Sequence, residues 1–498
     1  MGFSISIKQA NQRRWVSIAG TMLIALVPLW SGCRSVPTYT VASLYGPPPC
    51  SSFSRDPEIL VGLAVSGGGS RAAIFAAASF EALSQLRAGP DHRSLLDQVS
   101  YISSVSGGSL ASAYYALRKP PRTVPVLTPA GDLTDEYRQF FATFKETMAK
   151  DYEGPLLRRN LLYWRWVNPP WTARSLAEIL NEQEYYGGAK FADLAQREAK
   201  GDSPRLLINT TLYNNGRRLV LSTLPRSEAN YDLLGSVEAQ ASPQQADERL
   251  KKMLAAGRDT LVSMSLEELP IDVCGMRVAA AVTGSMSFPP LIGPVTLRVE
   301  GQERYWHIGD GGMSDNTGSE SLTMVFLKKL QENKASRAFV ILIDSSFPFS
   351  VGGKELDDRK EGFSFFDSDY SRIPSIMEER SLAYRGLFVS LGRQADVLPA
   401  ADRLGFIRLR HTDATWAEDL SDLPESCEEE KVNWKSPHEV GKHMASIVTR
   451  LWIKSDCDRD LIVVAAKKVV AANADAIRAF LDQGRRGASA GSHPNAEP

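Results

Sequence analysis

The chain has almost no net charge, no zinc-binding cysteine pattern and no internal repeat. Its 57 Lys and Arg residues against 58 Asp and Glu residues give a formal net charge of −1, so no overall field draws it to nucleic acid. None of the 5 cysteines lies in a CxxC pair or a Cys/His cluster. No repeat occurs at the spacing of solenoids or propellers. These absences leave an enzyme-sized globular chain of 498 residues.

The first 33 residues have the organisation of an export signal. Basic residues precede an apolar stretch over residues 15–30, which contains Pro28 and is marginal in length for a transmembrane helix. Ser31–Cys33 resembles the lipobox of bacterial lipoproteins, in which the cysteine is lipidated and becomes the new N-terminus. We expect residues 1–33 to be a signal peptide, with an uncleaved anchor or another export route as alternatives. Lipid on Cys33 would hold the protein at a bacterial membrane facing the periplasm, and Arg34 by resemblance favours the outer membrane.

Four cysteines remain if Cys33 is lipidated, and an exported chain meets an oxidising compartment where they can pair. They are Cys50, Cys274, Cys427 and Cys457. Three connectivities exist. The pair closest in sequence, Cys427 with Cys457, is our preference, and buried unpaired thiols are the alternative.

Alternating strand and helix patterns predict an α/β protein with a largely parallel sheet covered on both faces. Strands are predicted at 59–65, 99–105, 205–212, 217–221, 278–282, 305–308 and 338–343, and helices at 72–86, 107–117, 321–330, 438–453 and 460–481. The predicted organisation is a linker at 34–56, one large domain at 57–485 with a variable helical insert at 120–200, and a disordered tail at 486–498.

Aromatic and basic residues gather within the insert, over residues 156–171. Arginines beside tryptophans suit an anionic membrane interface, where rings lie at head-group level and cations meet lipid phosphates. We expect this segment to help load substrate from a membrane surface. An aromatic stretch that packs in the core is the alternative.

Three short segments, far apart in the chain, each follow a run that is predicted to be a buried strand. They are Gly67–Arg71, Ser104–Gly108 and Asp310–Gly312, and the first two also open a predicted helix. Acyl hydrolysis requires a nucleophilic oxygen, a base that takes its proton, and N–H donors for the oxyanion. Together the three segments supply a candidate for each requirement.

Ser106 is the candidate nucleophile and Asp310 the candidate base. A strand–turn–helix elbow would lift Ser106 out of the sheet, and the two glycines after it leave room. Ser104 stands where such an elbow usually has its first glycine. An aspartate that is the only base must be desolvated enough to accept a proton near neutral pH. Each motif alone would be an ordinary turn, so the assignment depends on their occurring together.

The glycine run predicts an oxyanion hole formed by Gly67, Gly68 and Gly69. Backbone N–H groups at a helix start favour negative charge because the helix dipole adds to their own. The competing interpretation, a phosphate cradle, lacks both a Lys-Ser/Thr pair and GxGxxG spacing. We expect Arg71, on the first helical turn, to bind an anionic head group of the substrate or to brace the loop; a surface salt bridge is the alternative.

This set of motifs resembles the patatin-like phospholipase family, which has a Gly-Gly-Gly-x-Arg loop, a serine elbow and an Asp-Gly-Gly segment. Residues 283–290, which end in Phe-Pro-Pro, and residues 207–216 also agree. The resemblance covers residues 58–345 in order. It implies a three-layer α/β/α fold, a Ser106–Asp310 dyad without histidine, and hydrolysis of phospholipid or lysophospholipid esters at a membrane surface without a metal or other cofactor.

Two other functions remain open. His411, His438 and His443 follow Asp310, which gives the Ser…Asp…His order of α/β-hydrolase triads. The second is a catalytically inactive lipid-binding protein, which the Ser104 departure favours and the otherwise intact motifs oppose.

Overall fold

The computed structural model describes most of the chain from residue 36 to residue 482. The described residues are 36–44, 50, 56–89, 91–163, 165, 168–229, 262–264, 269–289, 291–346, 381, 383, 401–432 and 434–482. The predicted signal peptide with Cys33 and the predicted tail at 486–498 lie outside them. Among the helices of these ranges, none combines the length and the apolar character needed to cross a membrane.

A mostly parallel sheet of nine strands forms the centre of the molecule. Its strands are β1 (Thr38–Val41), β2 (Ile59–Val65), β5 (Val99–Ser104), β6 (Arg205–Leu212), β7 (Arg218–Ser222), β8 (Val295–Val299), β9 (Tyr305–Asp310), β10 (Arg337–Asp344) and β11 (Leu404–Arg410). The order is β1-β8-β9-β6-β5-β2-β10-β11, and β7 pairs with β6. The strands from β6 to β11 in this order are parallel, whereas β9 is antiparallel to both β6 and β8. Two short strands, β3 (Arg87–Ala88) and β4 (Arg93–Ser94), pair separately.

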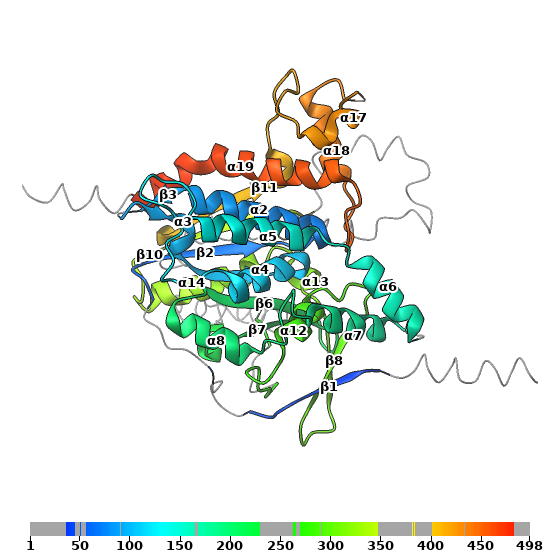
Figure 1. Cartoon of the computed structure of the whole chain (residues 1–498). Coiled ribbons are helices and arrows are strands. Elements are labelled where there is room, and N and C mark those ends of the chain that lie inside the picture. Colours follow the sequence, from blue (N-terminus) through cyan, green and yellow to red (C-terminus); the bar gives the residue numbers. More distant parts are fainter. Residues whose placement is uncertain are drawn as a thin grey trace, which may run out of the picture.

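Helices cover both faces of this sheet, which makes the predicted three-layer α/β/α fold. The helices are α2 (Gly69–Gln85), α3 (Leu95–Gln98), α4 (Ser106–Arg118), α5 (Asp135–Ala149), α6 (Glu153–Leu162), α7 (Pro169–Leu180), α8 (Phe191–Lys200), α9 (Arg226–Ala229), α12 (Val278–Ser285), α13 (Gly312–Asp315), α14 (Ser319–Gln331), α17 (Glu428–Lys431), α18 (Pro437–Ser446) and α19 (Asp456–Asp482). Figure 1 shows α2, α5 and α19 on one side of the sheet and α14 on the other.

Strand β2 is apolar along its whole length because both of its faces are buried. Successive side chains of a strand point to opposite faces. Leu63 and Val65 join the core under α2 and α19, whereas Leu60 and Ala64 join the core under α14. A Cβ atom at Gly62 would lie 2.6 Å from the Phe326 ring of α14. Glycine at this position therefore lets α14 pack closely on the sheet.

Most of the predicted strands and helices are present, but strands β8 and β11 were not predicted, and three further differences occur. The predicted strand at 278–282 is wrong, because these residues belong to helix α12. Its Val-Ala-Ala-Ala-Val run is buried on all sides, so it has no periodicity that separates a strand from a helix. The helix predicted over 438–453 ends at Ser446, and Ile447–Ser455 continues as irregular chain. In the predicted linker, Thr38–Val41 forms β1 and pairs in parallel with β8.

Two disulfides join segments that are distant in the sequence. Cys427–Cys457 confirms the preferred pair and links the start of α19 to the segment before α17. Cys50–Cys274 closes a separation of 224 residues and attaches the N-terminal segment to the region before α12. Closing long loops restricts the unfolded chain, which is the usual account of how such bonds stabilise a fold.

Candidate active site

Ser106 lies at a sharp turn between β5 and α4. Its φ angle is 51°, a left-handed conformation that residues other than glycine adopt rarely and that often marks a functional site. The Ser106 N–H donates to Ser285 Oγ at 2.9 Å. A Cβ atom at Gly107 would lie 2.0 Å from the Gly69 carbonyl oxygen, and one at Gly108 would lie 2.5 Å from the Ser66 carbonyl oxygen. The two glycines therefore let the elbow and the glycine loop approach each other closely.

Strand register brings Asp310 level with Ser106. On parallel strands β5 and β6, Ser104 pairs with Ile208, so the position of Ser106 corresponds to that of Thr210. Antiparallel β9 pairs Asp310 with that same Thr210. The carboxylate lies across one strand from Ser106, and the Ser106 hydroxyl is near enough to lower the pKa of that carboxyl.

The Asp310 carboxyl is held in a nearly dry position. Its side chain is 3% exposed, and its Oδ1 accepts a hydrogen bond of 2.7 Å from the Gly312 N–H. Burial raises the pKa of Asp310 to about 7, and the hydrogen bonds from Gly312 and Ser106 oppose this rise only in part. A Cβ atom at Gly311 would lie 2.4 Å from the Asn209 carbonyl oxygen. The glycines after Asp310 thus permit the close packing that excludes water.

The glycine loop leads from β2 into the N-terminus of α2. Gly68 and Gly69 have φ angles of 140° and 60°, which disfavour any other residue. Their N–H groups donate to no acceptor among the described residues, whereas the Gly67 N–H donates to the Asn316 carbonyl oxygen at 2.8 Å. The predicted donor role of Gly67 does not fit this arrangement, because that N–H is already paired. Gly68 and Gly69 remain as candidate oxyanion donors.

Arg71 supports this loop from inside the protein. Its side chain is 1% exposed, and its Nε donates to the Ser345 carbonyl oxygen at 3.1 Å. The remaining nitrogens bind the Ile447 carbonyl oxygen and, at 3.3 Å, Thr449 Oγ1. Of the roles that the sequence left open, these contacts match the brace, and the buried position excludes a surface salt bridge. They do not match the predicted contact with a substrate head group, because the guanidinium faces protein atoms.

The irregular segment Ile447–Ser455 lies against the same loop. The Ser70 N–H donates to the Arg450 carbonyl oxygen at 2.7 Å, and a Cβ atom at Gly69 would lie 2.3 Å from that oxygen. The next residue, Leu451, donates its N–H to Glu153 Oε1 of α6 at 3.2 Å. The sequence did not indicate this contact, because most of the segment was predicted to continue a helix.

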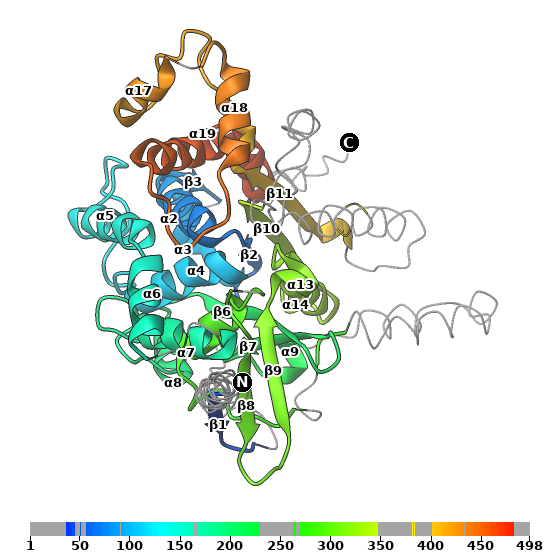
Figure 2. The ribbon, with the colours of Figure 1, turned by 90° about the vertical axis from the view of Figure 1, so that its right-hand side faces the viewer.

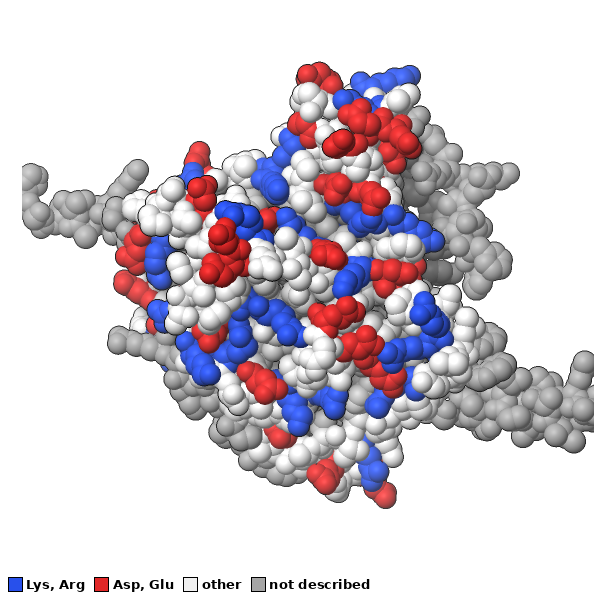
Figure 3. Space-filling model, viewed as in Figure 1, with Lys and Arg blue, Asp and Glu red and all other residues white. Residues whose placement is uncertain are grey.

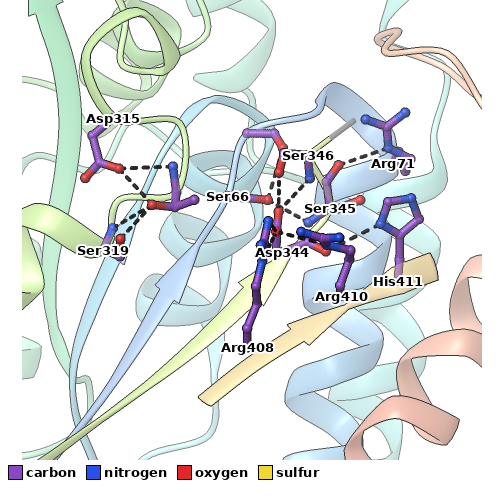
Figure 4. Close-up of polar contacts among 12 residues, drawn as sticks. Ser66, Arg71, Asp315, Ser319, Asp344, Ser345, Ser346, Arg408, Arg410 and His411 are labelled. Atoms are coloured by element: carbon purple, nitrogen blue, oxygen red, sulfur yellow. Dashed lines mark hydrogen bonds and ion pairs between the residues drawn. The ribbon is translucent and has the colours of Figure 1, made fainter. Parts of the chain in front are cut away.

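An ionic cluster lies beside the glycine loop at the ends of β10 and β11. Asp344 forms ion pairs with Arg408 and, at 3.7 Å, with Arg410. The Ser345 N–H donates to Ser66 Oγ at 2.7 Å, which connects the cluster to the loop. Figure 4 shows these side chains together with Arg71. Their buried charges are paired, so this cluster has the contacts of a structural support.

No histidine among the described residues contacts Ser106 or Asp310. His411 is buried, with Nδ1 3.4 Å from the Asp344 carbonyl oxygen and its ring against Phe75. Burial and the charge of Arg71 lower the pKa of His411 to about 3, which makes it a very weak base. His443 hydrogen-bonds to Asp458 Oδ1 at 2.6 Å. The triad interpretation therefore has no geometric support in the described structure.

Serines around the elbow complete the site, and sequence reasoning gave them no role. Ser285 Oγ donates to the Asn209 carbonyl oxygen at 2.7 Å while it accepts from the Ser106 N–H. Ser109 Oγ donates to Ser104 Oγ at 3.1 Å, so the hydroxyl that replaces the usual glycine is bonded within the elbow. The small-residue run at 283–290 was the available signal, because residues of this size fit against a tight turn.

The sheet and its two helical layers place the chain among three-layer α/β/α proteins. Its sequence matches the patatin-like phospholipase family over residues 63–322, which is more than half of the chain. The chain belongs to this family.

Solved structures that match this chain include two of low sequence identity. Human GIVD cytosolic phospholipase A2 is 15% identical with a TM-score of 0.41, over 86% of this chain and 63% of that chain. VipD from Legionella pneumophila is 15% identical with a TM-score of 0.24, over 88% of this chain and 78% of that chain. The chain thus spans less than two thirds of the human protein. A search of curated proteins found no match.

Proposed function

We propose that this chain is a serine lipid acyl hydrolase that cleaves acyl esters of phospholipids or lysophospholipids at a membrane surface. The strand register that places the Ser106 hydroxyl beside the buried Asp310 carboxyl carries the proposal. Burial raises the pKa of that carboxyl to about 7. A carboxyl group with that pKa accepts the serine proton and returns it within the physiological pH range.

Acylation begins when Ser106 Oγ attacks the ester carbonyl carbon and its proton moves to Asp310. The carbonyl oxygen becomes an oxyanion, which the N–H groups of Gly68 and Gly69 stabilise at the positive end of α2. The tetrahedral intermediate then breaks the bond between carbon and the leaving oxygen. Asp310 gives its proton to that oxygen, and the product alcohol departs.

Deacylation repeats these steps with water as the nucleophile. Asp310 takes a proton from water, and the resulting hydroxide attacks the acyl carbon. Collapse of the second intermediate breaks the bond to Ser106 Oγ, which takes the proton back from Asp310. The free fatty acid leaves, and each proton removed has been returned.

A fluorophosphonate probe tests this proposal because it phosphonylates an activated serine. We expect labelling of the purified chain, its loss in Ser106→Ala, and slow labelling in Asp310→Asn. Ser100→Ala, on the same strand β5, is the matched control and should label normally. Absence of labelling in the unsubstituted chain would favour the inactive lipid-binding alternative, and undiminished labelling of Ser106→Ala would place the nucleophile elsewhere.

We also propose that Cys33 carries lipid and holds the enzyme at a bacterial membrane facing the periplasm, by resemblance the outer membrane. The basic start, the apolar run and the small residues before Cys33 support it. Each buried methylene of the lipid would add about 0.8 kcal/mol of membrane affinity. Cys33→Ser should abolish labelling by a fatty-acid analogue and block precursor processing. Persistent labelling, or a mature N-terminus elsewhere, would contradict lipidation and leave the esterase proposal intact.

A further inference from the structure

Exposed apolar side chains concentrate at the C-terminal end of α6. Leu157, Leu161, Leu162 and Tyr163 are 59%, 56%, 69% and 56% exposed, and they are four of the eleven large hydrophobic residues that are exposed in the described structure. The opposite face of α6 packs inward through Leu156. Scattered exposed leucines are ordinary, but a contiguous apolar patch marks a binding surface.

One end of α6 is connected to the glycine loop. The side chain of Glu153, the first residue of α6, accepts a hydrogen bond from the Leu451 N–H. The carbonyl oxygen of Arg450, the residue before Leu451, accepts a hydrogen bond from the Ser70 N–H. Two hydrogen bonds, one of them accepted by the Glu153 side chain, therefore join the start of α6 to the glycine loop.

The other end of α6 is connected to Asp310. The chain continues from α6 into α7, where the Pro169 carbonyl oxygen accepts a hydrogen bond of 2.9 Å from the Gly293 N–H. Leu291, in the same loop as Gly293, is 79% exposed. That loop begins at Ser287, whose carbonyl oxygen accepts the Asp310 N–H at 2.9 Å. Hydrogen bonds thus connect the segments that carry the exposed leucines to the glycine loop and to Asp310.

The figures agree with these contacts. In Figure 1, α6 and α13 lie at the same end of the molecule, and Figure 2 looks onto that end with α6, α7, α13 and β9 on the face. Figure 3 shows basic side chains beside uncharged surface where α6 lies. Arg158 of α6 is exposed, and the Arg165 guanidinium lies 4.8 Å from the centre of the Tyr163 ring.

We propose that five residues, Leu157, Leu161, Leu162, Tyr163 and Leu291, form a rim that rests on a phospholipid bilayer and brings lipid esters to Ser106. This inference rests on the proposed function, because a bilayer is where such a substrate resides. Leucines enter the boundary between head groups and acyl chains, an aromatic ring lies at head-group level, and the exposed Arg158 meets lipid phosphates. The Trp164 and Trp166 side chains lie outside the described residues and carry no part of the argument.

Local fluorescence tests the contact without requiring catalysis. Leu162→Cys, labelled with an NBD dye in the full chain, should shift to the blue on vesicles of phosphatidylcholine and phosphatidylglycerol and be quenched by brominated phospholipid. Val432→Cys, at a position 83% exposed beyond α17, is the matched control and should do neither. The unsubstituted chain, treated with the same dye, gives the background. Equal signals from both positions would contradict the proposed contact of the rim with the bilayer. A blue shift that appears at high protein concentration without vesicles would indicate contact with a second copy of the chain and would also contradict the proposal.

Kinetics supply the second test. The double variant Leu161→Asp/Leu162→Asp should hydrolyse vesicle phospholipid about tenfold more slowly, because buried charge opposes insertion. Its turnover of a soluble short-chain ester should stay close to that of the unsubstituted chain, as should both activities of Val432→Asp. Equal losses on both substrates would show that the leucines support folding and would overturn the rim. If the unsubstituted chain hydrolysed neither substrate, the proposed function would fail, and the fluorescence result would still decide the rim.

Discussion

Asp310 and Asp344 each end a strand of the central sheet and are buried, yet their surroundings differ in charge. Asp310 accepts a hydrogen bond from the Gly312 N–H and lies near the neutral Ser106 hydroxyl, and no described Lys or Arg forms an ion pair with it. Burial therefore raises its pKa to about 7. Burial also acts on Asp344, but the charge of Arg408 and hydrogen bonds from Ser346 outweigh it and hold the pKa below its usual value.

This difference shows how one residue type serves chemistry at one strand end and structure at another. A permanently charged carboxylate, paired with arginine, cannot take up a proton at neutral pH and is suited to holding elements together. A buried carboxyl without a cation exchanges its proton near pH 7 and is suited to catalysis. Both aspartates lie at the end of a strand, so position in the sheet does not distinguish them. The charges of the neighbouring residues separate the catalytic role from the structural role.

The largest expected effect follows from removing the charge of Asp310. Asp310→Asn should lower kcat on a soluble ester by about four orders of magnitude, because the base is lost. Its free energy of unfolding at pH 8 should not fall, since burial disfavours the charge that the change removes. His411→Ala is the control for the triad alternative and should retain catalysis per folded molecule. Comparable inactivity of folded His411→Ala would replace the dyad by a triad.

Asp344→Asn should instead reduce stability. It leaves Arg408 and Arg410 without their buried counter-charge, which costs about 3–5 kcal/mol in the free energy of unfolding. Because the folded-state pKa of Asp344 lies below its usual value, its contribution is present above about pH 4 and is lost as pH falls further. Urea unfolding at pH 7 measures the loss. Unchanged stability together with lost turnover would reverse the roles that we assign to the two aspartates.

Gly68→Val should weaken stabilisation of the oxyanion that forms when Ser106 attacks the ester. A Cβ atom there would lie 2.7 Å from the Ser345 carbonyl oxygen at a φ of 140°, so the loop and its N–H donors must shift. Loss of one such donor costs about 3 kcal/mol, which is a hundredfold decrease in kcat with a smaller change in KM. Gly216→Val, at a turn with positive φ away from the site, controls for backbone strain. An unchanged kcat in Gly68→Val would remove this loop from the mechanism.

The sequence predicts the parts of this site that depend on local signals. The strand over 59–65 and the turns that follow it and β5 have glycine and apolar patterns that specify them. Ser106 could be singled out because a strand precedes it and two glycines follow it. Asp310 could be singled out for the same reason, although its strand is antiparallel to β6.

The remaining parts depend on contacts between distant segments. Arg71 could not be assigned a role from the sequence because its partners lie near Ser345 and in Ile447–Ser455. The helix over Val278–Ser285 was predicted as a strand because a fully buried run carries no period. Likewise the charge around Asp344 comes from β11, whose arginines have no sequence pattern that points to β10. Tertiary contact decides each of these features.

The pH dependence of turnover provides a smaller effect and a direct reading of Asp310. Asp310 must lose its proton to act as the base, so kcat/KM on a soluble ester should decline as pH falls through about 7, where its pKa lies. At pH 6 the value should be about tenfold below the alkaline plateau. Initial rates between pH 5 and pH 9 measure the profile. A limb centred near pH 4 would contradict the raised pKa.

Tyr213 allows the cause of that pKa to be tested. The Tyr213 ring lies against Gly309, the residue before Asp310, where a Cβ atom would lie 2.0 Å from ring atom Cε2. Burial and then the negative charge of Asp310 raise the pKa of Tyr213. Tyr213→Ala should admit water, lower the pKa of Asp310 and move the acid limb to lower pH. Tyr305→Ala, at the opposite end of β9 where the ring is also exposed, should leave the limb in place. If the acid limb stayed near pH 7 in both variants, shielding by Tyr213 would not be the cause of the raised pKa of Asp310. The packing around Gly311 would then account for the difference in pKa between Asp310 and Asp344.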